Sequence, residues 1–344
     1  MYKQPTHIDL TLPRSWNQCS TEQLELIAAA ILHHTQQQDR YHPFDWLAVK
    51  TELFFLFTGL EVTGEVSDPV DDDPEYQHRA FLVRRANTAS SLLANRVAQA
   101  KRLITPLHHR EGQGEGLFPI YVWQVQSFIE QHLAWIDDPK AAPLLIFPYK
   151  QLLWEWRFQL RPPFLKKHYL APGELLQDFS WQQYRHLQDY MEGYVHASNQ
   201  AVTIQQHQPI DRVRLAAATR QAEQMRTEFL RVLFKTEANS PLSTLNSQLK
   251  NFSPVRWQVI LFWWSGMMHY LQKQYPHCFK QSKKKAPSRQ PNPLELYTSV
   301  IATMQTQAHL SEDDINGQTF HIVLEQLERL AKQNEEMEKL SKKH

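Results

Sequence analysis

The residues from Ser180 to Tyr194 read SWQQYRHLQDYMEGY. The large apolar side chains of this stretch recur every three or four positions, which places them on one face of an α-helix. They are Tyr184, Leu187, Tyr190, Met191 and Tyr194. Ser180 and Gln183 have the spacing of a capping box, in which the two side chains satisfy backbone groups at a helix start. The stretch therefore predicts an amphipathic helix.

The same helical pattern recurs over most of the chain. Ser20 and Gln23 form a second capping box, and Gly59 stands where a left-handed cap would end a helix that Asp45 begins. Apolar periodicity of this kind predicts helices over 21–34, 45–58, 88–103, 121–135, from 180 onward, 211–234, from 253 onward, 294–307 and 320–330.

Strand signals are confined to the first half of the chain. Apolar and polar residues alternate over Ile8–Leu12, and Leu60–Val66 and Arg79–Val83 are further candidate strands. The 344 residues include only nine glycines, so tight-turned sheets are disfavoured. The predicted fold class is mainly α, with multi-helix bundle-like domains and a small antiparallel β-sheet near the N-terminus.

Proline and glycine mark a predicted domain boundary near 163–173, where Pro162 and Pro163 are followed by Pro172 and Gly173. We expect an N-terminal α(+β) domain over residues 1–165 and a C-terminal helical domain over 173–344. Residues 281–293, rich in lysine and proline, are expected to be an exposed linker.

Composition indicates a cytoplasmic globular protein. Hydrophobic residues make up 42% of the chain, and the two cysteines, Cys19 and Cys278, lie far apart, which fits free thiols in a reducing compartment. The N-terminus has no apolar run of secretory length. The most apolar stretch, Val259–Met268, is shorter than the roughly twenty residues that cross a bilayer.

No motif predicts catalysis, a cofactor or a metal site. The nine glycines complete no phosphate-binding loop, and no nucleophile motif or zinc-ligand spacing is present. The histidine pairs 33–34 and 108–109 are interpreted as surface residues. The acidic residues at 71–75 are interpreted as a solvated loop, and those at 312–314 as the start of a helix.

Charge is uneven along the chain. Residues 200–290 hold fourteen Lys and Arg against four Asp and Glu, a local charge of +10. Basic side chains interleaved with Trp257, Trp263 and Trp264 allow an alternative function, nucleic-acid binding by the region 212–289. Helical spacing favours a core position for Trp257 and Trp264. The candidate nucleic-acid contacts are Lys283, Lys284 and Lys285.

Three segments together resemble uncharacterised proteins of Bacteroidetes prophage and phage-tail-like gene clusters. The matching residues of the first segment are Leu12, Pro13, Ser15, Trp16, Thr21, Gln23 and Leu24. Those of the second segment are Leu165, Lys166, Lys167, Tyr169, Pro172, Leu176, Phe179, Tyr184, Asp189, Tyr190 and Tyr194. Those of the third segment are Tyr275, Pro276, Phe279, Asn316, Gln318, Phe320, Val323 and Leu324. Cys19 departs from the acidic residue expected before Thr21. The resemblance implies a helper or structural role in a tail-like particle, similar to a tail-assembly chaperone that binds a tape-measure-type partner.

The sequence as a whole favours a non-enzymatic protein-binding or assembly factor, acting on a protein partner and not on a membrane. The candidate partner-binding residues form one apolar stripe near the C-terminus: Phe320, Val323, Leu324, Leu327 and Leu330. The same stripe would suit packing within the chain's own core. The alternatives are nucleic-acid binding and, second, a hydrolase whose dispersed site is not visible in the sequence.

Overall fold

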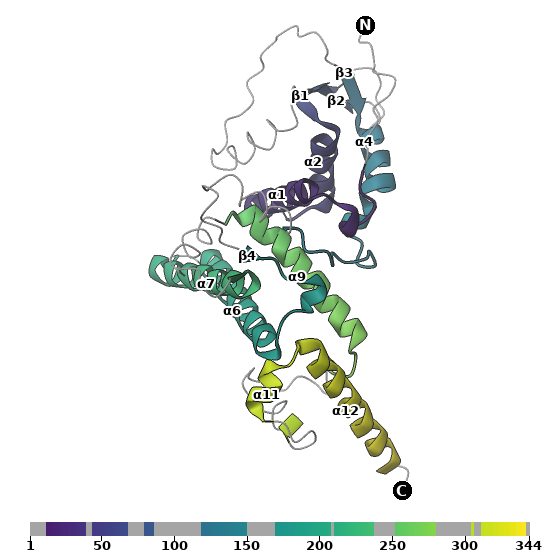
Figure 1. Cartoon of the computed structure of the whole chain (residues 1–344). Coiled ribbons are helices and arrows are strands. Elements are labelled where there is room, and N and C mark those ends of the chain that lie inside the picture. The colour runs from purple at the N-terminus through teal and green to yellow at the C-terminus, as the bar shows by residue number, and fades with distance from the viewer. Residues whose placement is uncertain are drawn as a thin grey trace, which may run out of the picture. The chain divides into compact units, whose positions relative to one another are not determined.

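The computed structural model describes nine stretches of the chain, which are mainly helical (Figure 1). These stretches are 12–38, 43–67, 79–85, 118–149, 169–207, 210–236, 252–279, 304–305 and 311–341. The helices predicted over 88–103 and 294–307 and the linker predicted over 281–293 lie outside them, apart from residues 304–305.

Eight α-helices occur among the described residues, which confirms the mainly helical fold class. Their bounds are α1 Thr21–Gln37, α2 Trp46–Thr58, α4 Val122–Phe128, α6 Trp181–Gln206, α7 Arg212–Leu233, α9 Pro254–Gln274, α11 Glu312–Gly317 and α12 Phe320–Ser341. The same described stretches contain five strands: β1 Leu60–Ser67, β2 Arg79–Arg85, β3 Phe118–Tyr121, β4 Tyr169–Leu170 and β5 Lys235–Thr236.

The predicted helix ends are confirmed at atomic detail. The hydroxyl groups of Ser20 and Ser180 each accept a hydrogen bond from the backbone N–H three residues later, and both capping boxes are complete. Gly59 ends α2 with a φ of 65°, the left-handed conformation that glycine adopts without steric cost.

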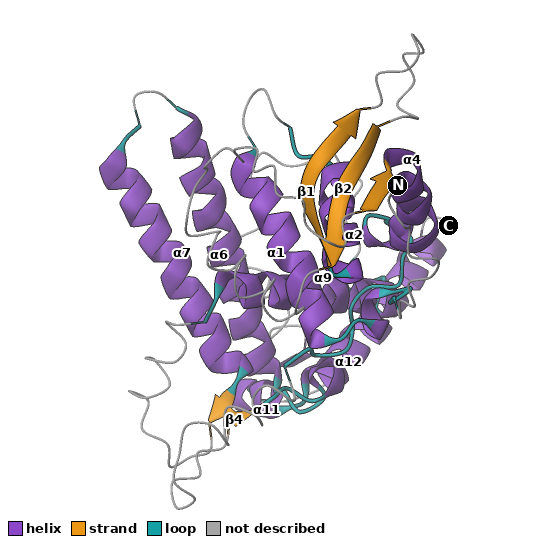
Figure 2. Ribbon diagram, turned by 90° about the horizontal axis from the view of Figure 1, so that it is seen from above, coloured by secondary structure: helices purple, strands orange, loops and turns teal. Residues whose placement is uncertain are grey.

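A small antiparallel sheet in the N-terminal half is also confirmed, with strand order β1-β2-β3 (Figure 2). Two of its strands match the predicted segments, since Leu60 pairs with Arg85 and Val66 with Ala80. The third strand is β3, whose Ile120 pairs with Phe81. Ile8 and its neighbours to residue 11 lie outside the described residues.

The helical region predicted over 121–135 is confirmed, since residues 122–136 are helical, but the width of its turns changes along the way. α4 ends at Phe128, and the chain continues as a wider π-helical turn, Ile129–Leu133, and a tighter 3-10 turn, Ala134–Ile136. Val125, Ile129, Leu133 and Ile136 are all buried in the core, and the change of turn width rotates the side chains that follow Ile129 toward it.

Two compact units emerge from the contacts of the chain. Unit 1 comprises 1–144 and 253–262, and unit 2 comprises 145–252 and 263–344. The predicted division into 1–165 and 173–344 stays a prediction.

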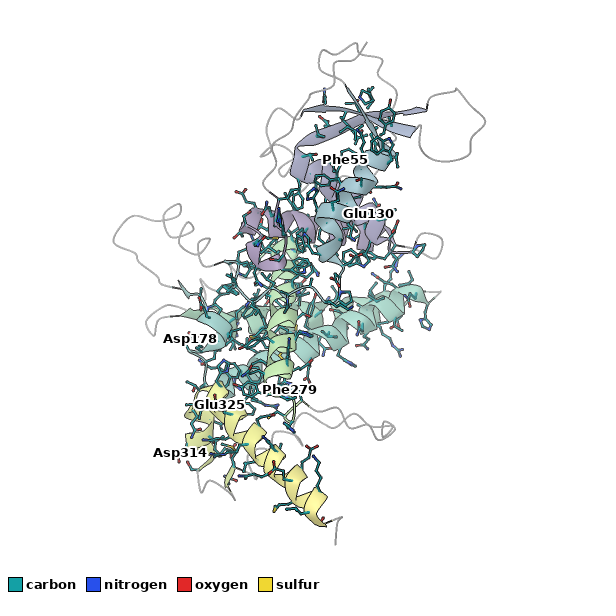
Figure 3. The ribbon with its side chains drawn as sticks, turned by 90° about the vertical axis from the view of Figure 1, so that its right-hand side faces the viewer. Phe55, Glu130, Asp178, Phe279, Asp314 and Glu325 are labelled. Atoms are coloured by element: carbon teal, nitrogen blue, oxygen red, sulfur yellow. The ribbon has the colours of Figure 1, made fainter. Side chains whose placement is uncertain are left out.

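Unit 1 has a core in which helices α1, α2 and α4 pack with the sheet. Ile27, Val49 and Leu53 are buried at its centre, and Phe55 of α2, labelled in Figure 3, makes an edge-to-face contact with Phe81 of β2 at 5.2 Å between ring centroids. Phe262 of α9 packs against this core as well.

Unit 2 is built around the antiparallel hairpin of α6 and α7, which lie side by side in Figures 1 and 2. Small residues allow this close approach, because a Cβ added at Gly193 would lie 2.9 Å from the Met225 sulfur. The aromatic rings of Phe229 and Trp264 meet edge to face at 5.1 Å. Trp263 is fully buried and donates a hydrogen bond to the Leu145 carbonyl at 3.2 Å.

Candidate functional site

The start of α12 is fixed in the core of unit 2. The ring of Phe320 stacks on that of Tyr184 with centroids 4.6 Å apart and 12° between the planes. The Phe320 backbone N–H donates to the Phe179 carbonyl, and the Trp181 N–H donates to the Gln318 carbonyl. Side-chain and backbone contacts therefore both hold this end of α12 against the start of α6.

The predicted partner-binding stripe of α12 is divided by this packing. Phe320 and Val323 have no exposed surface and Leu324 is 3% exposed, whereas Leu327 and Leu330 are half-buried. Three of the five candidate side chains thus stabilise the chain's own fold. Farther along the helix, Met337 and Leu340 are exposed.

A carboxylate on α12 binds the turn that follows α9. Glu328 lies one turn after Glu325, which Figure 3 labels, and accepts backbone hydrogen bonds from His277 and Cys278, each at 2.9 Å from Oε2. The His277 ring contacts Glu328 Oε1 through Nδ1, and its Nε2 lies 3.5 Å from Glu335. Burial alone would raise the pKa of Glu328, but these hydrogen bonds lower that pKa below its usual value.

His277, Glu328 and Cys278 lie together, and catalytic sites often contain these three residue types. Burial, together with the nearby Glu328 carboxylate, raises the pKa of the Cys278 thiol to about 12. Burial also raises the pKa of Cys19 to about 12. Since the thiolate is the nucleophilic form of cysteine, these raised pKa values favour the protonated thiol at neutral pH.

The distal half of the α6–α7 hairpin presents apolar side chains to solvent. We call residues 195–220 of this hairpin, without residues 208–209, the hairpin arm. Its exposed aliphatic residues are Val195 at 47%, Val202 at 51%, Ile210 at 46% and Val213 at 81%. Two of them, Val195 and Val202, are seven residues apart on α6 and therefore share one face of the helix.

Basic side chains border these valines. Arg212, Arg214 and Arg220 of α7 are exposed, and Arg220 follows Val213 by seven residues, so it lies on the same helix face. Arg214 forms an ion pair with Asp211 at 3.3 Å. The hairpin arm therefore carries both exposed apolar and exposed basic side chains.

The tryptophans and two of the basic side chains that suggested nucleic-acid binding do not support it in the structure. Trp257, Trp263 and Trp264 are all buried, so their rings are unavailable as platforms for stacked bases. Arg226 and Arg256 are paired with Glu223 and Glu25. The candidate contacts Lys283, Lys284 and Lys285 lie outside the described residues.

Packing of α1 against α2 brings together three potential metal ligands. His33 and His34 occupy the last turns of α1, and Glu52 lies on α2. Their ligand atoms all lie within 4.8 Å of one another. Sequence reasoning noted the histidine pair but interpreted it as surface, because its carboxylate partner comes from another helix at no characteristic spacing.

Of the remaining segments considered for metal or phosphate binding, one lies in the described part of the chain. Glu312, Asp313 and Asp314 form the first turn of α11, with Ser311 and Asp314 as a capping box, which confirms the predicted helix start. The acidic residues at 71–75, the glycines at 112–116 and the histidines at 108–109 lie outside the described residues.

The helices of the described part include none that is both long and apolar enough to span a membrane. No family model, curated protein sequence or solved structure matches this chain.

Proposed function

We propose that the chain is a non-enzymatic assembly factor that binds an amphipathic, acidic helix of a partner protein along the hairpin arm. The observation that carries this proposal is the exposure of four aliphatic side chains, three on α6 and α7 and one on the connection between them, led by Val213 at 81%. A helix with an apolar stripe is the ligand that such a surface accommodates, through contacts spaced three, four and seven residues apart.

These valines are not needed to hold the hairpin together. The contact between α6 and α7 includes the close approach of Gly193 and Met225, and the buried residues of the hairpin arm are the small Ala197 and Ala218. Covering the exposed aliphatic side chains with a partner would remove apolar surface from water at no cost to the fold.

The positive charge of the hairpin arm favours an acidic partner. The exposed guanidinium groups of Arg212, Arg214 and Arg220 favour a partner whose apolar stripe is flanked by Asp or Glu. Because these charges are exposed to solvent, they contribute mainly to association rate and specificity, and salt should weaken binding.

The resemblance of residues 12–24, 165–194 and 275–324 to tail-cluster proteins supports one biological setting for this activity. In that setting the partner is a long helical component of a phage-tail-like particle, of the tape-measure type, and the chain acts as its assembly chaperone. The proposal includes no catalytic step, and it is independent of the undescribed lysines at 283–285.

Site-specific photo-crosslinking tests this proposal in the cells that naturally produce the protein. A photoreactive residue at position 202 or 213 should crosslink to the same protein, and one at the exposed polar position 182, outside the hairpin arm, should not. In a matched pair of variants, Val202→Glu/Val213→Glu should lower the affinity for that protein at least about tenfold, because charges replace the apolar contacts. Gln182→Glu/Gln224→Glu adds the same charge at exposed polar positions of α6 and α7 outside the hairpin arm and should retain binding.

Three results would overturn the proposal. The chain is recovered as a monomer with no crosslinked protein, both double variants bind the partner equally well, or the crosslinked species is a nucleic acid. Circular dichroism should show equal helix content in both variants, since every substituted side chain is exposed and glutamate is a good helix former.

A further inference from the structure

The geometry points to a site for a divalent transition metal, zinc in particular, formed by His33, His34 and Glu52. His33 Nδ1 lies 3.0 Å from Glu52 Oε2, and His34 Nε2 lies 3.1 Å from the same oxygen. Two imidazoles and one carboxylate are a ligand set that zinc takes in proteins, and imidazole favours zinc over magnesium or calcium.

The distances suit a bound ion. Zinc bonds of about 2.0–2.1 Å in a tetrahedron place neighbouring ligand atoms about 3.3 Å apart. The two observed distances between nitrogen and oxygen fall a few tenths of an ångström short of this value. Small rotations of the side chains would therefore admit the ion without moving α1 or α2.

His34 carries the strongest indication of a missing ligand. Its Nε2 is buried and has no hydrogen-bond partner within the described stretches, although Glu52 Oε2 is only 3.1 Å away. A buried polar nitrogen without a partner is unfavourable, and coordination of a metal by its lone pair would remove that cost.

His33 has a side-chain amide beside the ring nitrogen that would face away from the metal. Its Nε2 lies 2.8 Å from the side-chain nitrogen Nε2 of Gln37, one turn farther along α1, so in this arrangement the Gln37 amide donates to the ring. A ligating histidine usually donates its other ring N–H to an oxygen, and the Gln37 amide can turn its oxygen toward the ring. With the Gln37 oxygen turned to the ring, Nε2 would carry the proton and the Nδ1 lone pair would be directed at the metal.

The site has room for one more ligand. Three protein ligands leave the fourth tetrahedral position to water or another small ligand, and the His33 side chain is 45% exposed. Because the ligands come from α1 and α2, zinc would join the end of one helix to the middle of the next. Binding of zinc to the folded chain alone would then stabilise unit 1.

Zinc titration of the full chain, prepared without a polyhistidine tag and freed of metal by chelation, tests the site. Calorimetry should show one zinc ion per chain, and binding should weaken at least about tenfold in both His33→Ala/His34→Ala and Glu52→Gln. Zinc should raise the thermal midpoint of the unaltered chain and not that of the variants. Cobalt(II) in place of zinc should give the visible absorption of a tetrahedral site.

His186→Ala/His196→Ala is the matched control, because it removes two exposed histidines from α6 and leaves the three ligands in place. This variant should bind zinc as the unaltered chain does. The proposal is overturned if the control loses as much affinity as the ligand variants, or if Glu52→Gln, with native helix content, binds zinc normally. It is also overturned if the unaltered chain shows no zinc binding, in which case the cluster is a hydrogen-bonded pair of histidines around a carboxylate.

Discussion

Lys50 is a charged residue that folding places among apolar side chains. It lies on α2 between the buried Val49 and the core residue Leu53, and its Nζ is 2.6 Å from Asp137 Oδ1. A buried ammonium group needs such a partner, because an unpaired charge in this position is strongly unfavourable. The pair therefore ties α2 to the end of the 3-10 turn at Ile136.

Removing the carboxylate should show what this pairing contributes. Asp137→Ala leaves Lys50 without its partner and should lower the free energy of unfolding by about 2 kcal/mol, measured by urea denaturation. Asp138→Ala removes a neighbouring, exposed carboxylate and should cost less than about 1 kcal/mol. Equal losses in the two variants would contradict a specific role for the ion pair.

The backbone conformation of Gly59 allows a second test of how a single residue affects stability. Its φ of 65° is unfavourable for any side chain with a Cβ, although the surrounding space is open. Gly59→Ala should therefore destabilise the protein by about 1 kcal/mol through the backbone alone. Gly317→Ala, which adds a Cβ in equally open space at the end of α11 without a positive φ, should change stability little. A thermal midpoint unchanged by Gly59→Ala would refute this explanation.

Single residues also show what the sequence can and cannot predict. Ser20, Ser180 and Gly59 were predictable because a helix cap depends on neighbours within three or four positions. The approach of Glu52 to His33 depends on how α1 packs against α2, and no local pattern encodes that packing.

Among the elements, α12 shows how one apolar stripe serves different purposes along its length. Phe320 is buried, Leu330 is half-buried and Leu340 is exposed. Periodicity predicted the stripe and its helix, but burial depends on which other elements reach it. Glu328, in the middle of α12, is bound by the turn after α9 instead of facing solvent.

The Glu328 contact should make the anchoring of α12 sensitive to acid. Since folding lowers the pKa of Glu328, its stabilising effect is present at neutral pH and is lost as the pH falls through that lowered pKa. Urea midpoints measured between about pH 7 and pH 3 should therefore fall in the unaltered chain. Glu328→Gln should be less stable at neutral pH and less dependent on pH.

Glu325→Gln is the control for this experiment, because Glu325 is exposed on the same helix. It should leave the pH dependence of the unaltered chain in place. A Glu328→Gln protein with an unchanged pH profile would show that the acid response comes from other groups.

At the scale of the whole molecule, fold class was predictable and the division of the chain was not. The scarcity of glycine and the helical apolar period are properties of composition and local spacing, so they predicted a mainly helical chain with a small sheet. The third strand, β3, is four residues long and contains Pro119, which local strand signals do not favour. Which residues belong to one compact unit depends on contacts between segments far apart in the sequence, and the spacing of apolar residues carries no information about those contacts.

The division of α9 between the two units has a consequence for how the protein is made. Residues 253–262 complete unit 1, and Phe262 packs against its core, yet more than one hundred residues of unit 2 precede them in the chain. A ribosome therefore releases residues 1–144 long before the segment that finishes their core. During that interval the nascent unit exposes apolar surface, and fragments that stop at residue 144 should aggregate unless a cellular chaperone shields them.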